Sequence, residues 1–361
     1  MNRRRLSKKI WICADVWMDI LPFFERVELG LILAMVSDRL DALVDTHFDA
    51  KSELTISNST LISKDKGPKP KLSVRIDDTF VAFPFPDRPL PNKIRFKQLQ
   101  ISYINHSVIE FLRSNKQIWD CDRMGTEFEL NVSYKTEDNH PIWEVFGRQI
   151  WPIFAPSIRH LTCCDHLDNM RRHISPTILT DLDQLISIVS EHLFPDAIAD
   201  DGPNATAGQA LSKWLHTPRK NGQPKRLLCA DFLADLDWIN DFKETFLRAT
   251  ASVSYKIRID IGLPIKPIEQ FELVNERTKE KLILEKKFGQ CWLLKRCPII
   301  VGETATVWWE NDAIWDANLK NVKFNLFGGQ SSTGTRPKRK KNKKKEKKRA
   351  KALKRRRIPR K

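Results

Sequence analysis

Two histidines and two cysteines lie within seven residues of one another and form the densest group of candidate metal ligands in the chain. The group contains His160, Cys163, Cys164 and His166, with His173 nearby. On a strand, His160, Cys164 and His166 would share one face and offer three zinc ligands. A closed zinc site also requires a fourth ligand and a turn that sets tetrahedral geometry. The alternative is a strand whose Leu161 and Cys163 face the core, and we predict no metal and no cofactor.

Catalytic motifs do not accompany this cluster. The chain lacks the GxxxxGK[ST], GxGxxG, GxSxG and HExxH patterns of phosphate-binding, dinucleotide-binding, acyl-transfer and zinc-protease sites. The eight histidines are scattered along the sequence. No cysteine lies among residues that would activate a thiolate. We therefore predict no catalytic residue and a protein that is not an enzyme.

The elements that could position functional side chains begin with residues 12–45, the longest helical pattern in the chain. Apolar residues recur there at intervals of three and four, which keeps one face of a helix apolar. The most regular part of the pattern is Leu29, Leu33, Val36, Leu40 and Leu43. Burial stabilises each Leu, Ile or Phe by about 1.5–3 kcal/mol, and short helices cannot cover this much surface alone. We expect the segment to pack on the remainder of the chain or on a partner protein.

Polar and apolar residues follow one another in this segment in a specific order. The order consists of Ile12, Val16, Asp19-Ile20, Phe23-Phe24, Glu28-Leu29, Val36-Ser37, Arg39 and Leu43-Val44-Asp45. It resembles an F-box, a three-helix module that binds the Skp-type adaptor of a cullin-based ubiquitin ligase. An F-box usually opens with Leu-Pro and has an aromatic residue near its end, where this chain has Ile12-Cys13 and Leu40. The runs Pro86–Phe96 and Trp292–Ile299 resemble nematode F-box-associated proteins.

The resemblance implies a substrate-recruiting subunit, which is a scaffold and needs no reactive residue. The N-terminal helices would bind the adaptor, the adaptor would connect the chain to the cullin, and residues 93–326 would capture an unknown target protein. The residues expected to contact the adaptor are Ile12, Val16, Ile20, Phe23, Phe24, Leu29, Leu33, Val36 and Leu40.

The net charge of +17 comes entirely from residues 336–361. This segment has 18 Lys/Arg and one acid, while the remaining residues hold 44 of the 62 Lys/Arg and 44 of the 45 Asp/Glu. A segment of such composition is disordered alone, and its basic clusters predict binding to a nuclear import receptor. The alternative function is a nuclear or nucleolar RNA-associated protein whose tail neutralises phosphates without base preference. The clusters are Lys338, Arg339, Lys340, Lys341, Lys354, Arg355, Arg356 and Arg357.

The number and spacing of the cysteines and the hydropathy of the chain indicate its cellular location. The seven cysteines are odd in number and have no CxxC spacing, which indicates reduced thiols of a cytosolic or nuclear protein. No run of 18 consecutive apolar residues is present, so we expect no membrane span and no membrane partner. The predicted location is the nucleus, with the nucleolus and the cytoplasm as further compartments.

Strand-like and helix-like segments alternate between residues 93 and 265. The predicted strand and helix pairs are 96–103 with 106–119, 158–165 with 176–193, and 226–232 with 238–249. Their strand cores resemble one another but recur about every 65 residues, far beyond the 20–29 residues of a leucine-rich repeat. Strand-like runs follow at 271–275, 281–288, 291–296 and 322–327. We therefore expect an irregular α/β arc or layered domain followed by a β meander.

The predicted fold class is α+β. It has an N-terminal three-helix F-box-like module, an irregular α/β domain with a leucine-rich-like arrangement as an alternative, a C-terminal β meander and a disordered basic tail. The predicted divisions are a basic N-terminus (1–9), the helical module (10–50), a Pro-rich connector (51–92), the α/β domain (93–265), a β-rich part (266–327) and the tail (328–361).

Overall fold

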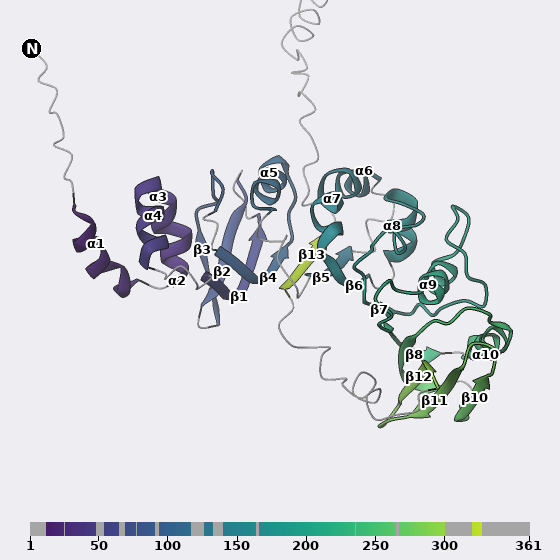
Figure 1. Cartoon of the computed structure of the whole chain (residues 1–361). Coiled ribbons are helices and arrows are strands. Elements are labelled where there is room, and N and C mark those ends of the chain that lie inside the picture. Colours follow the sequence, from purple (N-terminus) through teal and green to yellow (C-terminus); the bar gives the residue numbers. More distant parts are fainter. Residues whose placement is uncertain are drawn as a thin grey trace, which may run out of the picture.

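The computed structural model describes most of the chain between residues 12 and 326. The described residues are 12–24, 26–47, 54–64, 69–76, 78–90, 94–116, 126–132, 140–163, 166–234, 236–264, 267–299 and 320–326. Within them the protein is α+β, as predicted, with helices and one large mixed sheet. Figure 1 shows the elements following one another along an arc.

Thirteen described strands form this sheet in the order β10-β11-β12-β9-β8-β7-β6-β5-β13-β4-β1-β2-β3. The central strands from β9 to β1 are parallel, and antiparallel strands extend both ends. The strands are β1 (Leu54–Ser63), β2 (Lys71–Ile76), β3 (Thr79–Phe83), β4 (Ile94–Ile101), β5 (Thr126–Val132), β6 (Ile158–Thr162), β7 (Ser187–Glu191), β8 (Lys225–Ala234), β9 (Tyr255–Pro264), β10 (Phe271–Asn275), β11 (Glu280–Lys286), β12 (Cys291–Pro298) and β13 (Lys320–Leu326).

One transverse row of buried side chains crosses the sheet and explains why the strand cores look alike. Each member of the row is the register partner of the next and is less than 2% exposed. The row is Leu99, Val322, Phe128, Leu161, Ile188, Leu227, Ile257 and Leu294. Leu99, Leu161 and Leu227 therefore occupy equivalent positions in the core, although helices and other strands separate them along the chain.

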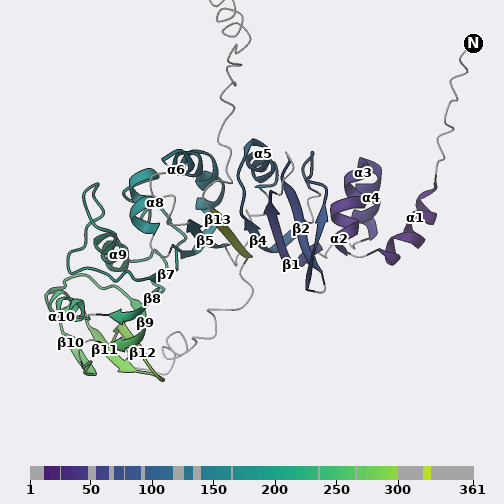
Figure 2. The ribbon, with the colours of Figure 1, turned by 180° about the vertical axis from the view of Figure 1, so that it is seen from behind.

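Helices cover one face of the sheet, and their buried residues share its core. They are α5 (His106–Ser114), α6 (His140–Val145), α7 (Trp151–Phe154), α8 (Leu167–His173), α9 (Ala207–His216) and α10 (Trp238–Arg248). Figures 1 and 2 show these helices along one side of the strands. We call the opposite side, which carries Gln100, Glu129, Arg226, Arg258 and Lys295, the open face.

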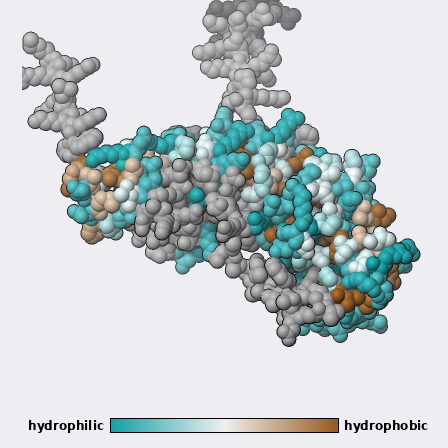
Figure 3. All heavy atoms as spheres, viewed as in Figure 1, coloured by the Kyte–Doolittle hydropathy of each residue, from teal (hydrophilic) through white to brown (hydrophobic). Residues whose placement is uncertain are grey.

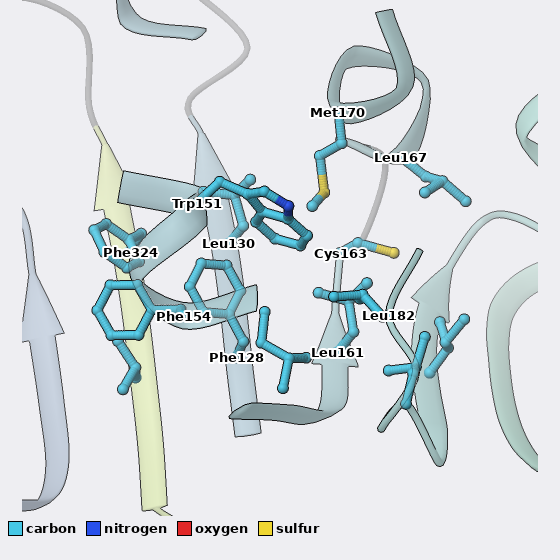
Figure 4. Close-up of a cluster of buried hydrophobic side chains, with 14 of the residues drawn as sticks. Phe128, Leu130, Trp151, Phe154, Leu161, Cys163, Leu167, Met170, Leu182 and Phe324 are labelled. Atoms are coloured by element: carbon cyan, nitrogen blue, oxygen red, sulfur yellow. The ribbon is translucent and has the colours of Figure 1, made fainter. Parts of the chain in front are cut away.

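Strand β13 lies in the middle of the sheet between β4 and β5 and is parallel to both. Its Phe324 ring lies 5.4 Å from Phe128 of β5 and 5.7 Å from Phe154 of α7, measured between ring centroids. Figure 4 shows these aromatic rings beside the aliphatic and sulfur-containing side chains of the same core. The predicted strand at 322–327 is thus present, and it completes the centre of the sheet.

The N-terminal residues form α1 (Ala14–Ile20), a 3-10 turn (Leu21–Phe23), a helix from Arg26 to Val36 and α4 (Asp38–His47). The helix from Arg26 to Val36 consists of α2 (Arg26–Glu28), a π-helical segment (Leu29–Leu33) and α3 (Ala34–Val36). The single apolar helical face predicted from Leu29 to Leu43 is interrupted, because Ser37 is extended, with φ −162° and ψ 156°. The Ser37 hydroxyl accepts a hydrogen bond from the Leu40 amide at 3.2 Å and so caps α4. We call residues 12–47 the N-terminal module.

Two predicted segments differ in the structure. Residues 176–193, predicted as helical, form successive turns followed by strand β7. Their apolar residues at intervals of three are still buried, since each turn directs one into the core: Leu179, Leu182 and Leu185. The Pro-rich connector contains β1, β2 and β3, so it belongs to the same sheet as the predicted domains after it.

The sheet also joins the predicted α/β domain and the β-rich part, because β12 pairs with β9. None of the helices in the described ranges is long and apolar enough to cross a membrane.

Candidate protein-docking site

The N-terminal module carries a group of exposed apolar side chains that no described part of the chain covers. Phe23 is 88% exposed and Val36 is 62% exposed. Figure 3 shows apolar side chains gathered at this end of the molecule. We call the group the module's apolar surface: Ile12, Val16, Phe23, Phe24, Ile32 and Val36.

The helix from Arg26 to Val36 uses its other two faces to hold the module in place. One face joins the module's own small core, which consists of Leu21, Leu29, Ala34 and Val44. A second face packs on the core of the sheet through Val27 and Leu31, with Met35 beside them. The wider π-helical turn at Leu29–Leu33 lies between these contacts, and such turns are frequent at functional sites. Ile32 and Val36 remain on the third face, four residues apart.

The structure places the predicted adaptor residues in three different environments. Ile12, Val16, Phe23, Phe24 and Val36 are exposed, while Ile20, Leu33 and Leu40 are partly buried. Leu29 is only 1% exposed and lies in the module's core, so it supports helix packing and presents no surface. Ile32, which was not among the predicted contacts, is 43% exposed. Its spacing of four from Val36 is the sequence signal that identifies it.

Carboxylates follow one side of α4 next to this surface. Asp38, Asp41 and Asp45 recur at intervals of three and four, so they share a helix face. Burial, and then the charges of Asp45 and Asp38, raise the pKa of Asp41. The Arg39 guanidinium donates to the Ile12 carbonyl at 2.6 Å, which ties the start of α1 to α4. The module therefore presents apolar side chains beside an acidic helix face.

Comparisons with protein-family models, curated proteins and solved structures find no match to this chain. The interpretation of the module therefore depends on its geometry and on the order of its residues.

The histidine–cysteine cluster is divided between different environments. Leu161 and Cys163 are buried in the sheet core, as the alternative interpretation predicted. His160 lies on the sheet, with Nδ1 2.6 Å from the Ser187 hydroxyl. His166 precedes helix α8, and its ring lies 6.3 Å from Trp143. Cys164 lies outside the described residues, and among those described no group of three His, Cys, Asp or Glu residues could hold a metal.

Basic side chains gather near His160 at the amino ends of β6 and β8. Burial, followed by the charges of Arg226, Arg159 and Arg219, lowers the pKa of His160 to about 4. Burial, and then the charges of Arg159 and Arg226, also lower the pKa of Arg219. His160 is therefore neutral at physiological pH and acts as a hydrogen-bonding group on the sheet.

A concave region lies on the open face at the carboxyl ends of β7, β8 and β9. The turn between β11 and β12 closes one side, and the cavity has a volume of about 510 Å³. Its one thiol, Cys291, has a pKa raised to about 11 by burial and by the neighbouring Asp260. This thiol is protonated at neutral pH, so the cavity is suited to binding more than to nucleophilic chemistry.

Proposed function

We propose that this protein is a substrate-recruiting F-box subunit of a cullin-based ubiquitin ligase. Its N-terminal module would bind a Skp-type adaptor, and its sheet would hold a target protein. The observation that carries the proposal is the module's apolar surface, which stays exposed although the same helices are already packed on two other faces. Exposed apolar patches of this kind are typical of protein-binding surfaces.

The attachment of the module supports this role. Val27 and Leu31 fix it to the sheet core, so binding at the opposite face would require no rearrangement of the body. Arg88, in the segment before β4, adds an ion pair to Asp38 at 3.0 Å. A rigidly attached docking module would hold the target-binding body at a constant position relative to the ligase, which ubiquitin transfer to a bound target requires.

Purified Skp-type adaptor and the full-length chain provide the direct test, by surface plasmon resonance. Phe23→Ser removes the most exposed apolar side chain of the module and should leave folding unchanged. If the partner covers this ring, burial contributes about 2 kcal/mol, and the dissociation constant should rise roughly thirtyfold. Val36→Asp, which places a charge in the same surface, should weaken binding further.

A matched control is Phe80→Ser on β3, a ring that is 51% exposed but lies outside the module. It should leave adaptor affinity unchanged. A full-length chain that binds neither adaptor nor adaptor–cullin complex at micromolar concentration would overturn the proposal, as would equal losses in Phe23→Ser and Phe80→Ser.

The basic tail adds a proposed location. Its 18 Lys/Arg among residues 336–361 support nuclear import, and the remaining residues hold equal numbers of acidic and basic side chains. A fluorescent fusion should lose nuclear accumulation when Lys338–Lys341 and Lys354–Arg357 are replaced by serine. The RNA-associated alternative is favoured instead if these substitutions abolish RNA binding that weakens steeply with salt while adaptor binding is absent.

A further inference from the structure

The concave region of the open face forms a groove where β7 ends at Glu191 and the parallel strands β8 and β9 continue past it. Its floor comes from Ala230 of β8 and from β9, and its sides come from Phe232 and from the turn at Phe288–Cys291. The volume of about 510 Å³ falls within the 300–1,000 Å³ typical of sites that enclose a small ligand or an anchoring side chain. We call it the β7–β9 groove.

Two phenylalanines stand at the groove, and both are held in position while remaining exposed. Phe232 is 65% exposed and Phe288 is 67% exposed. The Phe232 ring lies against Gly262, where a Cβ atom would come within 2.5 Å of the ring and 2.9 Å of the Phe232 carbonyl oxygen. The Arg258 guanidinium lies 5.7 Å from the centre of the Phe288 ring, a cation–π contact. Rings already fixed in this way lose little conformational freedom when a partner binds.

The charges of the groove are predominantly negative. Its lining has three carboxylates, those of Glu191, Asp231 and Asp260, against one guanidinium. That guanidinium, from Arg258, is committed to Asp260 through contacts of 3.0 and 2.9 Å. Asp231 contacts His192 and follows the core-facing Cys229 by two residues, so Glu191, which pairs in register with Ala230, is the carboxylate that a bound segment would meet.

The backbone next to these carboxylates is in an uncommon conformation. His192 follows Glu191 with φ +57°, a left-handed value that few residues other than glycine adopt. Its Nδ1 lies 3.1 Å from the Asp231 carboxylate. Uncommon backbone conformations concentrate at ligand-binding positions because the surrounding structure must maintain them.

We propose that the β7–β9 groove binds an extended segment of the target protein in which a lysine or arginine adjoins an apolar residue. The apolar side chain would lie between Phe232 and Phe288, and the cation would reach Glu191. This inference rests on the proposed function, because it names the chemistry that the body of a substrate-recruiting subunit would recognise. The binding is non-covalent, since the Cys291 thiol is protonated.

The test uses the full-length chain without adaptor and an array of eight-residue peptides. The two central positions vary over Lys, Arg, Glu and Ser at one place and Leu, Phe and Ser at the other. Peptides with a basic residue beside Leu or Phe should be selected. Phe232→Ser or Phe288→Ser should weaken the best peptide about five- to thirtyfold in fluorescence anisotropy. Glu191→Lys should shift the selection from basic toward acidic peptides.

Phe80→Ser is again the matched control, because its ring is similarly exposed and lies on the far edge strand β3. Selection without a basic preference, or the same loss in Phe80→Ser as in Phe232→Ser, would overturn the proposal. A carbodiimide crosslink between Glu191 and a lysine of residues 338–354 of the same chain would also overturn it, by identifying the tail as the occupant. Adaptor binding is measured in a separate experiment. Failure of peptide binding therefore leaves the adaptor proposal standing, and failure of adaptor binding does not change the peptide result.

Discussion

The buried ion pair between Arg296 of β12 and Glu280 of β11 allows a quantitative test of the structure. The two side chains are 2% and 0% exposed, and Arg296 donates to Glu280 from Nη2 at 2.7 Å and from Nε at 3.1 Å. The same pair also binds the chain before β9. Arg296 donates to the Ala251 carbonyl at 2.8 Å, and Glu280 accepts from the Ser252 hydroxyl and the Val253 amide at 2.7 and 2.8 Å.

Arg296→Met keeps most of the volume but leaves the Glu280 carboxylate buried without its cation. Removal of one partner of a buried pair costs about 3–5 kcal/mol of unfolding free energy. In the double variant Arg296→Met with Glu280→Met, neither charge of the pair remains. The Val253 amide and the Ala251 carbonyl still lose their partners, at about 1–3 kcal/mol for an unsatisfied buried group. The double variant should therefore be more stable than Arg296→Met alone.

Equilibrium unfolding in urea, followed by tryptophan fluorescence, measures all of these free energies. The single and double variants together form a double-mutant cycle, whose coupling energy should be several kcal/mol. The reasoning is refuted if Arg296→Met costs less than about 1 kcal/mol, or if the losses of the two single variants simply add.

Three further predictions concern stability. Burial lowers the pKa of His216 to about 4, so the unfolded chain binds a proton at a higher pH than the folded chain. Protonation of this residue in the unfolded chain should therefore lower the unfolding free energy by about 3 kcal/mol between pH 6.5 and pH 4, and His216→Gln should remove that part of the pH dependence, measured by urea unfolding at each pH. Arg171 donates to the carbonyls of Pro176, Gly202 and Ala205, so Arg171→Met should accelerate limited proteolysis at residues 196–206 severalfold, and an unchanged rate would contradict the role of these contacts. Ser37→Ala removes the cap of α4 and should cost about 1 kcal/mol, seen as faster amide exchange in residues 38–47 but not in the sheet.

The sequence predicted most strands because their burial is periodic and local. Residues such as Leu227 and Ile257 stand in short runs of β-branched and aliphatic residues between turns. The same reasoning failed at residues 176–193, because a turn that places one Leu in the core every three residues has nearly the period of a helix. The Asp181 carboxylate accepts from the Ser175 and Thr177 hydroxyls in those turns, and Thr180 donates to Asp201, a contact between distant residues that has no local sequence signal.

The strand order of the sheet could not be predicted from the sequence. Strand-like character at 322–327 is visible, but its neighbours β4 and β5 lie more than 180 residues earlier. The break between α3 and α4 could have been predicted, since Ser37 followed by Asp38 is a helix-start signal. In contrast, the sequence could not show that Leu29 is buried while Val36 is exposed. Both residues are hydrophobic, and the fold decides which face of the helix meets the module's core.

The residues of the β7–β9 groove are visible in the sequence, but their arrangement is not. Phe232 and Phe288 read as ordinary core residues in the sequence, and Gly262 reads as an ordinary glycine. Only the structure brings Gly262 against the Phe232 ring and leaves both rings exposed.

The position of β13 has a consequence for how the protein is made on the ribosome. Lys323 of β13 pairs with Glu129 of β5, across 194 residues of chain. Until residue 326 has emerged from the ribosome, β4 and β5 have no strand between them, and each presents an unpaired edge. A translation product that stops before residue 320 would keep both edges exposed, and chaperones and proteases could recognise it by them. Insertion of β13 therefore distinguishes chains that extend past residue 326 from chains interrupted before it.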